Sequence, residues 1–233
     1  MEFNVNNSKN LEIVVDDITY LRHAIKTHYV KVGDNYMDII EKYVKDVYEE
    51  GDILSISEKI IALCQNRVVY AKDLKIGLLA KFISFFAAKP EVGGMGAGNI
   101  YKMQFTIDLC GPLKVIYAAI AGGICKLFGK KGIYYEILGK EISGIDGFYP
   151  SQYKEYVDMG IRIPDRCNEV CNEIYDKFKV KAMIVDACEF GVEIFGKCDE
   201  LNNIDDEVLK NVIRDNPACQ DKEQTPLILI RKK

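Results

Sequence analysis

Short apolar runs that alternate like β-strands are interleaved along this chain with segments whose apolar residues recur at helical spacing. Strands are predicted at residues 11–15, 24–30, 52–57, 132–137, 141–145, 180–185 and 226–230. Helices are predicted at residues 36–48, 58–63, 74–88, 112–128, 165–179 and 204–214. Because the two kinds of segment are interleaved, the sequence predicts a mixed α+β fold class.

The size of the chain allows one large domain or two small interlocked ones. It has 233 residues, of which 48% are hydrophobic and 28% charged, an ordinary globular composition. We expect a single domain over residues 1–233, with a possible break between subdomains near residues 89–100. The formal net charge of -4 provides no general positive field, which argues against a nucleic-acid partner.

Two features bear on the cellular compartment. The N-terminal segment is polar and lacks the apolar core of a signal peptide, so we expect a cytoplasmic protein with reduced cysteines. Cys167 and Cys171 lie four residues apart on a predicted helix, where core packing is the favoured role.

Residues 112–128 are the most apolar stretch, but Lys114 and Lys126 bracket fewer residues than the ~20 that cross a bilayer. That stretch shows no cationic amphipathic face, so a buried or partly interfacial helix is predicted rather than a membrane attachment.

Carboxylates and a basic corner are the candidates for chemistry. Asp146 and Asp186 each follow an apolar, strand-like run, and strand ends are where α/β proteins collect ligands. The two acids could share a hard cation, or each could cap the following turn. Ser57 and Lys59 stand at a strand-to-helix corner that could bind an anion, or could be an ordinary helix start with Lys59 in solvent.

Three further segments leave alternatives open. Asp34 follows Gly33 and is predicted to cap the helix at residues 36–48, a second possible anion site. Arg67 could orient a phosphate or carboxylate, or could pair with a nearby acid. Residues 92–99 are rich in glycine but lack the ending of a Walker loop, so they could bind phosphate or form a linker or lid.

The order of these segments resembles a known family. THYVKVGDNYMDIIEKYV, GDILSISEKIIALCQNRVV, GIDGFYP and KAMIVDACEFG follow one another with the order and spacing of the coenzyme F-420-0:glutamate γ-ligase family, from about Thr27 to Gly191. The resemblance implies a ligase-like fold in an intertwined homodimer, with GTP as co-substrate and Mg²⁺ or Mn²⁺ held near strand-end acids. It also implies an enzyme that joins glutamate to a carboxylate of the deazaflavin coenzyme through an amide bond.

Carried onto this chain, the resemblance assigns Asp146 and Asp186 to metal binding. Asp34, Ser57, Lys59 and Arg67 are the residues expected at the nucleotide. The partners implied are a nucleotide and a small carboxylate or amino-acid substrate.

The chain also departs from the family pattern. After Asp186 the family has a hydroxyl residue and a Gly-Arg pair, whereas Ala187, Cys188 and Val192 stand in this region here. The polar segment 215–226 also differs from the family's C-terminus. A non-catalytic or regulatory ligand-binding relative of the same fold is therefore the alternative.

Overall fold

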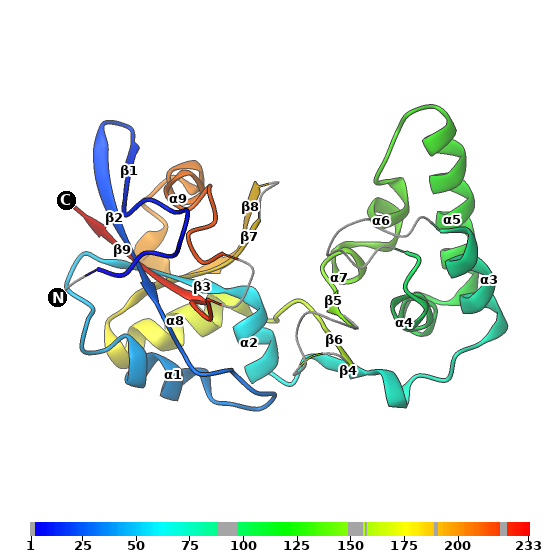
Figure 1. Ribbon diagram of the computed structural model, residues 1–233, viewed down its shortest axis with the longest axis horizontal. Coiled ribbons are helices and arrows are strands. Elements are labelled where there is room, and N and C mark those ends of the chain that lie inside the picture. The colour runs from blue at the N-terminus through cyan, green and yellow to red at the C-terminus, as the bar shows by residue number, and fades with distance from the viewer. Residues whose placement is uncertain (1–2, 88–96, 149–155, 157, 189–190, 220–222) are drawn as a thin grey trace. The chain divides into compact units, whose positions relative to one another are not determined.

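The computed structural model describes residues 3–87, 97–148, 156, 158–188, 191–219 and 223–233. The chain divides into two compact units (Figure 1). Unit 1 consists of Met1–Asn66 and Pro164–Lys233, and unit 2 of Arg67–Ile163. Most of the expected break near 89–100 lies outside the described residues, and residues 97–100 belong to unit 2.

Unit 1 is built on a six-stranded sheet with the strand order β1-β2-β9-β3-β7-β8. Its strands are β1 (Glu12–Val15), β2 (Ile18–Ile25), β3 (Ile53–Ser57), β7 (Lys181–Cys188), β8 (Gly191–Lys197) and β9 (Leu227–Lys232). Its helices are α1 (Tyr36–Tyr43), α2 (Glu58–Cys64), α8 (Cys167–Phe178) and α9 (Asp206–Val212), with the short 3-10 helix η3 (Asp199–Leu201). Strands β3 and β7 run parallel to each other, and the other neighbours are antiparallel.

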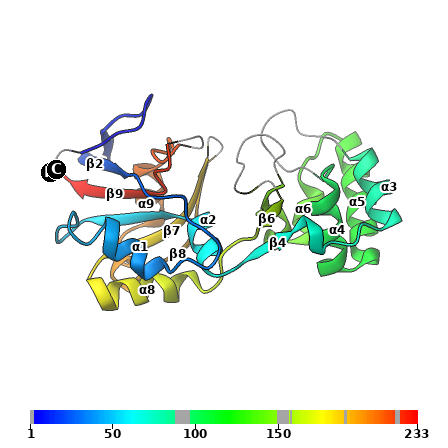
Figure 2. The ribbon, with the colours of Figure 1, turned by 60° about the horizontal axis from the view of Figure 1, so that its bottom comes forward.

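Helices cover both faces of this sheet. The sulfur of Cys171 in α8 lies 3.8 Å from the carbonyl oxygen of Gly196, which pairs with Ile184, and Ile184 in turn pairs with Ile56. Helix α9 lies over Ile53, which points to the opposite face because it is three residues from Ile56. Figure 2 shows α8 running along β7 and β8. The central strands are buried on both sides, which explains their continuous apolar sequences.

The sequence located most of these elements, with three corrections in unit 1. The strand expected at 24–30 is wrong beyond Ile25, because the real strand begins at Ile18 after a two-residue hairpin turn. Asp16 and Asp17 form that turn with φ of 49° and 61°, a left-handed conformation that Asp tolerates. The helix expected to reach residue 48 ends at Tyr43, and strand β8 was not predicted. Cys167 and Cys171 are buried, which confirms their role in packing.

Unit 2 is a group of helices beside a small sheet. The helices are α3 (Leu78–Phe86), α4 (Ile100–Cys110), α5 (Pro112–Leu127), α6 (Ile133–Leu138) and α7 (Lys140–Ser143), after the 3-10 helix η1 (Ala71–Asp73). The sheet has the order β4-β6-β5, formed by β4 (Val68–Tyr70), β5 (Asp146–Gly147) and β6 (Met159–Ile161). Met103, Val115, Ala118 and Ile142 are fully buried in the core of the unit.

The strand pair expected at 132–137 and 141–145 is wrong, since these residues form α6 and α7. Gly132 and Gly139 precede the two helices with φ of 92° and 97°, so each opens a new turn where a strand would continue. Leu138 and Ile142 then share one side and enter the core. Short apolar runs do not distinguish strand from helix by themselves. Helix α5 has nearly the predicted bounds, and no helix among the described residues is long and apolar enough to span a membrane.

Candidate functional site

The carboxyl ends of β3 and β7 meet at one edge of the unit 1 sheet. Ser57, the last residue of β3, is the Cα partner of Val185, so Asp186 follows one residue beyond this pair. Lys59 belongs to the first turn of α2, which begins directly after Ser57. Ligands of open α/β sheets bind at the carboxyl ends of parallel strands. The fold therefore brings Ser57, Lys59 and Asp186 to the same edge.

A buried carboxylate changes the charge of the corner between β3 and α2. Glu58 is 3% exposed, and its Oε1 atom accepts a hydrogen bond from Nζ of Lys59 at 3.0 Å. Ser57 is the residue that precedes α2, but its side chain makes no capping hydrogen bond, and its N–H donates to the carbonyl of Pro226 at 2.9 Å. The ammonium group of Lys59 is therefore partly neutralised before any ligand arrives. Sequence reasoning missed Glu58, because an acid in a first helical turn is usually exposed.

Asp186 is not beyond the strand end, as the sequence suggested, but inside β7, where it is paired with Glu193 of β8. Partners of this kind point to the same face with Cβ atoms about 4.5–5.5 Å apart. Two carboxylates placed opposite each other repel, and a cation between them relieves the repulsion. Glu193 was missed because β8 was not predicted.

Asp34 belongs to a different cluster, at the other end of α2. Gly33 donates its N–H to the carbonyl of Leu63 at 3.0 Å, so Asp34 is separated from the corner by much of α2, which is about 10 Å long. The predicted capping role of Asp34 is wrong. Asn35 caps α1 instead, accepting the N–H of Met37 at 2.9 Å.

The carboxylate of Asp34 is occupied by neighbours in its own loop. It accepts the N–H of Lys31 at 2.8 Å and lies 3.2 Å from Nε2 of His28. The other ring nitrogen of His28 is 2.9 Å from the hydroxyl of Tyr43. The backbone hydrogen bond from Lys31, followed by the contact with His28, lowers the pKa of Asp34. The result is a partly exposed Asp-His-Tyr chain.

Asp146 lies in unit 2, and it begins β5 after a helix, whereas the sequence placed it after a strand. Its charge acts on Lys102, a buried residue of α4. The ammonium group of Lys102 donates to the carbonyl of Ile145 at 3.1 Å and lies 5.2 Å from the ring centre of Tyr135. Burial lowers the pKa of Lys102 to about 8, although Asp146 acts in the opposite direction. Sequence reasoning missed Lys102, because α4 was not predicted.

Arg67 also belongs to unit 2, where it is held by an acid. Its Nη2 atom is 2.9 Å from Oε2 of Glu141, and its Nε donates to the carbonyl of Ile163 at 2.5 Å. Arg162 binds the other oxygen of Glu141 at 2.5 Å. The sequence left two roles open for Arg67, pairing with an acid or contact with a nucleotide. The structure shows the pair with Glu141, and contact with a nucleotide stays a prediction.

The carboxylates of unit 1 suit a cation that keeps part of its water shell. Within the described residues, no group of three or more His, Cys, Asp or Glu side chains could hold a metal ion. Mg²⁺ commonly uses only one or two carboxylates together with substrate phosphates. The oxygen donors of Asp186 and Glu193 fit that requirement. The predicted pairing of Asp146 with Asp186 joins residues of different units and stays a prediction.

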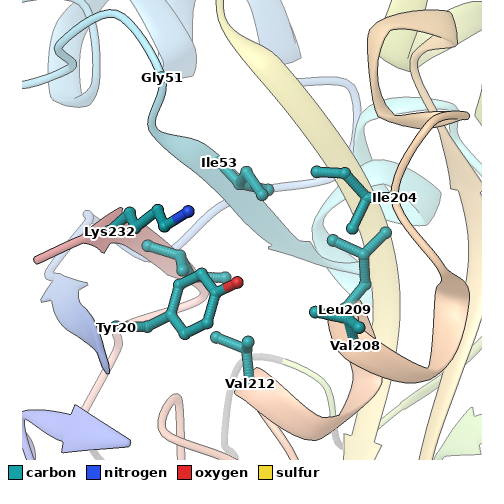
Figure 3. Close-up of a pocket in the computed structure, with 9 residues that line it drawn as sticks. Tyr20, Gly51, Ile53, Ile204, Val208, Leu209, Val212 and Lys232 are labelled. Carbon is teal, nitrogen blue, oxygen red and sulfur yellow. The ribbon is translucent and has the colours of Figure 1, made fainter. Parts of the chain in front are cut away.

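A separate hollow of about 230 Å³ lies between α9 and the sheet of unit 1 (Figure 3). Its lining is mainly apolar and includes Ile53, Leu209 and Val212, with Tyr20 and Lys232 as polar members. It lies at the amino end of β3, whereas Ser57 is at the carboxyl end. It is also smaller than the ~300 Å³ at which ligand pockets begin. The hollow is therefore distinct from the edge that carries Ser57 and Asp186.

Comparison with known proteins identifies a related family over part of the chain. The family model described as F420-0:Gamma-glutamyl ligase matches residues 24–94, a segment that contains Asp34, Ser57, Lys59 and Arg67. An uncharacterized protein from Methanocaldococcus jannaschii is 27% identical over 85 residues, which cover 35% of this chain and 28% of that protein. The aligned part is thus less than a third of the relative's length. The resemblance predicted from the sequence is confirmed over residues 24–94, where the chain matches the F420-0:gamma-glutamyl ligase family.

Proposed function

We propose that the protein is a nucleotide- and metal-dependent ligase that forms an amide bond between a small carboxylate and an amino acid. The observation that carries the proposal is the family match over residues 24–94, which includes the β3–α2 corner. The parallel register that brings Asp186 to this corner supports it. By resemblance the co-substrate is GTP and the acceptor is the deazaflavin coenzyme F-420-0.

In the proposed reaction the γ-phosphoryl group moves to an oxygen of the substrate carboxylate, which gives an acyl phosphate and a nucleoside diphosphate. The amine then attacks the acyl carbon, inorganic phosphate leaves, and the amine loses a proton. Phosphoryl transfer of this kind depends mainly on positioning and charge neutralisation. A bound Mg²⁺ or Mn²⁺ supplies neutralisation of the phosphate charge.

The residues of the corner divide these tasks. Lys59 and the first N–H groups of α2 bind phosphate oxygens, and Lys59 exchanges part of its contact with Glu58 for the phosphate. Asp186 and Glu193 hold the cation. The resemblance also assigns Asp146 to metal binding, and Asp34 and Arg67 are expected at the nucleotide; Asp146 and Arg67 belong to unit 2, and these three roles stay predictions.

Asp186→Asn is expected to weaken Mn²⁺-dependent nucleotide binding by about tenfold or more, because it removes one charge-assisted ligand. The thermal midpoint should stay equal or rise slightly, since the variant removes a like charge facing Glu193. Calorimetric titration of GTP with Mn²⁺ measures the affinity. Lys59→Ala should weaken the same titration, and Asp176→Asn, at an exposed position of α8, is the matched control. If Asp186→Asn and Lys59→Ala both bound GTP with wild-type affinity, the assignment of these residues to metal and phosphate binding would be wrong.

The non-catalytic alternative is favoured by one observation in the sequence. Ala187 and Cys188 stand where the family has a hydroxyl residue after its second aspartate. A regulatory relative would bind nucleotide without forming nucleoside diphosphate in the presence of any carboxylate and amine. An assay for nucleoside diphosphate and amide product separates the two functions, because only the ligase forms both.

We also propose a homodimer, which the resemblance implies. Light scattering at micromolar concentration should give twice the chain mass of 26.4 kDa. A clean monomer mass would remove the family-type assembly from the proposal.

A further inference from the structure

Unit 2 exposes many large apolar side chains on two neighbouring helices. Phe85 and Phe86 of α3 are 79% and 71% exposed, and Leu113 and Leu127 of α5 are 82% and 85% exposed. Phe82 and Tyr117 are also exposed on the same two helices. We call this surface the α3–α5 face. Single exposed apolar residues are normal, but a contiguous group of this kind marks a binding surface.

The α3–α5 face points away from the core of unit 2. Ala80 and Ser84 of α3 and Val115 and Ala118 of α5 are buried, so each helix already uses its other side for packing. Phe82 and Phe86 are four residues apart, as are Leu113 and Tyr117, so each pair lies on one stripe of its helix. Both helices pack against α4, and α3 lies next to α5 in both ribbon views (Figures 1 and 2).

The charges around this face are mainly positive, with exposed acids only at the borders of the two helical segments, at Asp73, Asp108 and Glu136. Residues 74–87 and 109–135 contain no Asp or Glu. The same segments carry exposed lysines at Lys75, Lys81, Lys114, Lys126, Lys130 and Lys131. No ion pair with a residue in the described part of the chain is found for these six. Among the described residues, the surface therefore combines aromatic and aliphatic side chains with an excess of positive charge.

We propose that the α3–α5 face docks on the surface of an anionic lipid bilayer. Phenylalanine and leucine side chains on an exposed helix enter the boundary between headgroups and acyl chains, while lysines bind anionic headgroups. With 16 residues, α5 is about 24 Å long, shorter than the ~30 Å hydrocarbon core, so it lies in the plane of the interface. The proposal concerns unit 2 alone and does not depend on the ligase function.

A second copy of the chain fits this face less well. In a twofold interface the same patch meets itself, so the six lysines of one copy would oppose those of the other, with only Asp73, Asp108 and Glu136 at the borders of the two segments. Anionic lipid headgroups supply negative charge opposite these lysines. The docking proposal therefore requires the proposed homodimer to use another surface.

Flotation of the full chain with lipid vesicles tests the proposal. The wild-type protein should bind vesicles made of equal parts phosphatidylcholine and phosphatidylserine, and bind vesicles of phosphatidylcholine alone much more weakly. Binding should fall when the salt rises from about 0.1 M to about 1 M, because the Debye length shortens. The double variant Phe85→Ser/Phe86→Ser should lose about tenfold or more in partitioning. Val14→Ser, at an exposed apolar position of β1, is its control.

Charge variants distinguish binding to anionic headgroups from nonspecific hydrophobic adsorption. Lys130→Gln/Lys131→Gln should lower partitioning onto the anionic vesicles by about 25-fold, since each lysine contributes about fivefold. The control Lys26→Gln/Lys45→Gln, at exposed positions of unit 1, should leave partitioning unchanged. Absence of wild-type binding to anionic vesicles would overturn the proposal, and so would lysine variants that bind normally. A Phe85→Ser/Phe86→Ser protein that changes from dimer to monomer in light scattering would show that a second copy occupies the face, which also overturns it.

Discussion

Asp215→Ala should lower the free energy of unfolding of unit 1 by about 3 kcal/mol, because it leaves a buried arginine without its counter-charge. Arg22 of β2 is 2% exposed, and its guanidinium contacts both carboxylate oxygens of Asp215, with the Nη2 to Oδ2 bond at 3.1 Å. The same Nη2 donates to the carbonyl of Asn10 at 2.6 Å. Because the Asp215 side chain is 37% exposed, water can reach part of the vacated site, which sets the effect at the lower end for broken buried pairs.

Urea unfolding of paired variants measures this effect. Arg22→Met added to Asp215→Ala should recover part of the lost stability, since no charge then stays buried. Glu12→Ala removes one partner of the exposed pair with Lys233 and should cost less than about 1 kcal/mol. If Asp215→Ala cost no more than Glu12→Ala, Arg22 would have to be hydrated in the folded protein, contrary to the structure.

Acid should weaken the same contact. Burial acts to raise the pKa of Asp215, but the hydrogen bond and the charge of Arg22 outweigh burial, and the pKa is lowered. A carboxyl group with a lowered folded pKa stabilises the fold above its unfolded pKa, near 4, and loses this contribution as the pH falls further. The stability difference between wild type and Asp215→Ala should therefore shrink below about pH 4.

The stability difference between the wild type and Lys102→Met should move in favour of the wild type by about 3 kcal/mol between pH 7 and pH 10.5. Burial lowers the pKa of Lys102 from 10.5 to about 8, so between these values the unfolded chain binds the proton and the folded chain does not. Under that condition stability rises with pH. Below about pH 8 both states are protonated, and the folded protein bears the full cost of the buried charge.

The comparison with Lys102→Met is needed because other groups titrate in the same range. Burial raises the pKa of the Cys64 thiol to about 12, so this group stabilises the fold at pH 7 and loses that effect as the unfolded thiol ionises. Subtracting the stability of Lys102→Met from that of the wild type at each pH removes the contributions that both proteins share. Lys72→Met, at an exposed position of unit 2, is the matched control. If the difference in unfolding free energy between wild type and Lys102→Met did not change with pH, Lys102 would not be buried as the structure places it.

Local signals in the sequence predicted the parts of the candidate site that lie close together along the chain. The β3–α2 corner was found because an apolar run, a serine and helix formers follow one another directly. The apolar strands β7 and β9 were found because both are buried on two sides and need no alternation. Helices α6 and α7 were predicted as strands, since their packing rather than their short apolar runs decides the conformation.

By itself, the sequence determined the mixed α+β class, the β3–α2 corner with Ser57 and Lys59, the helix over most of 112–128, and the family match over residues 24–94. Only the tertiary structure brought Asp186 beside that corner, buried Glu58 against Lys59 and set Glu193 opposite Asp186. It also joined two separate segments into the α3–α5 face. The physical reason is that periodicity and capping act over a few residues, whereas burial, charge pairing and strand register depend on residues brought together from distant parts of the chain.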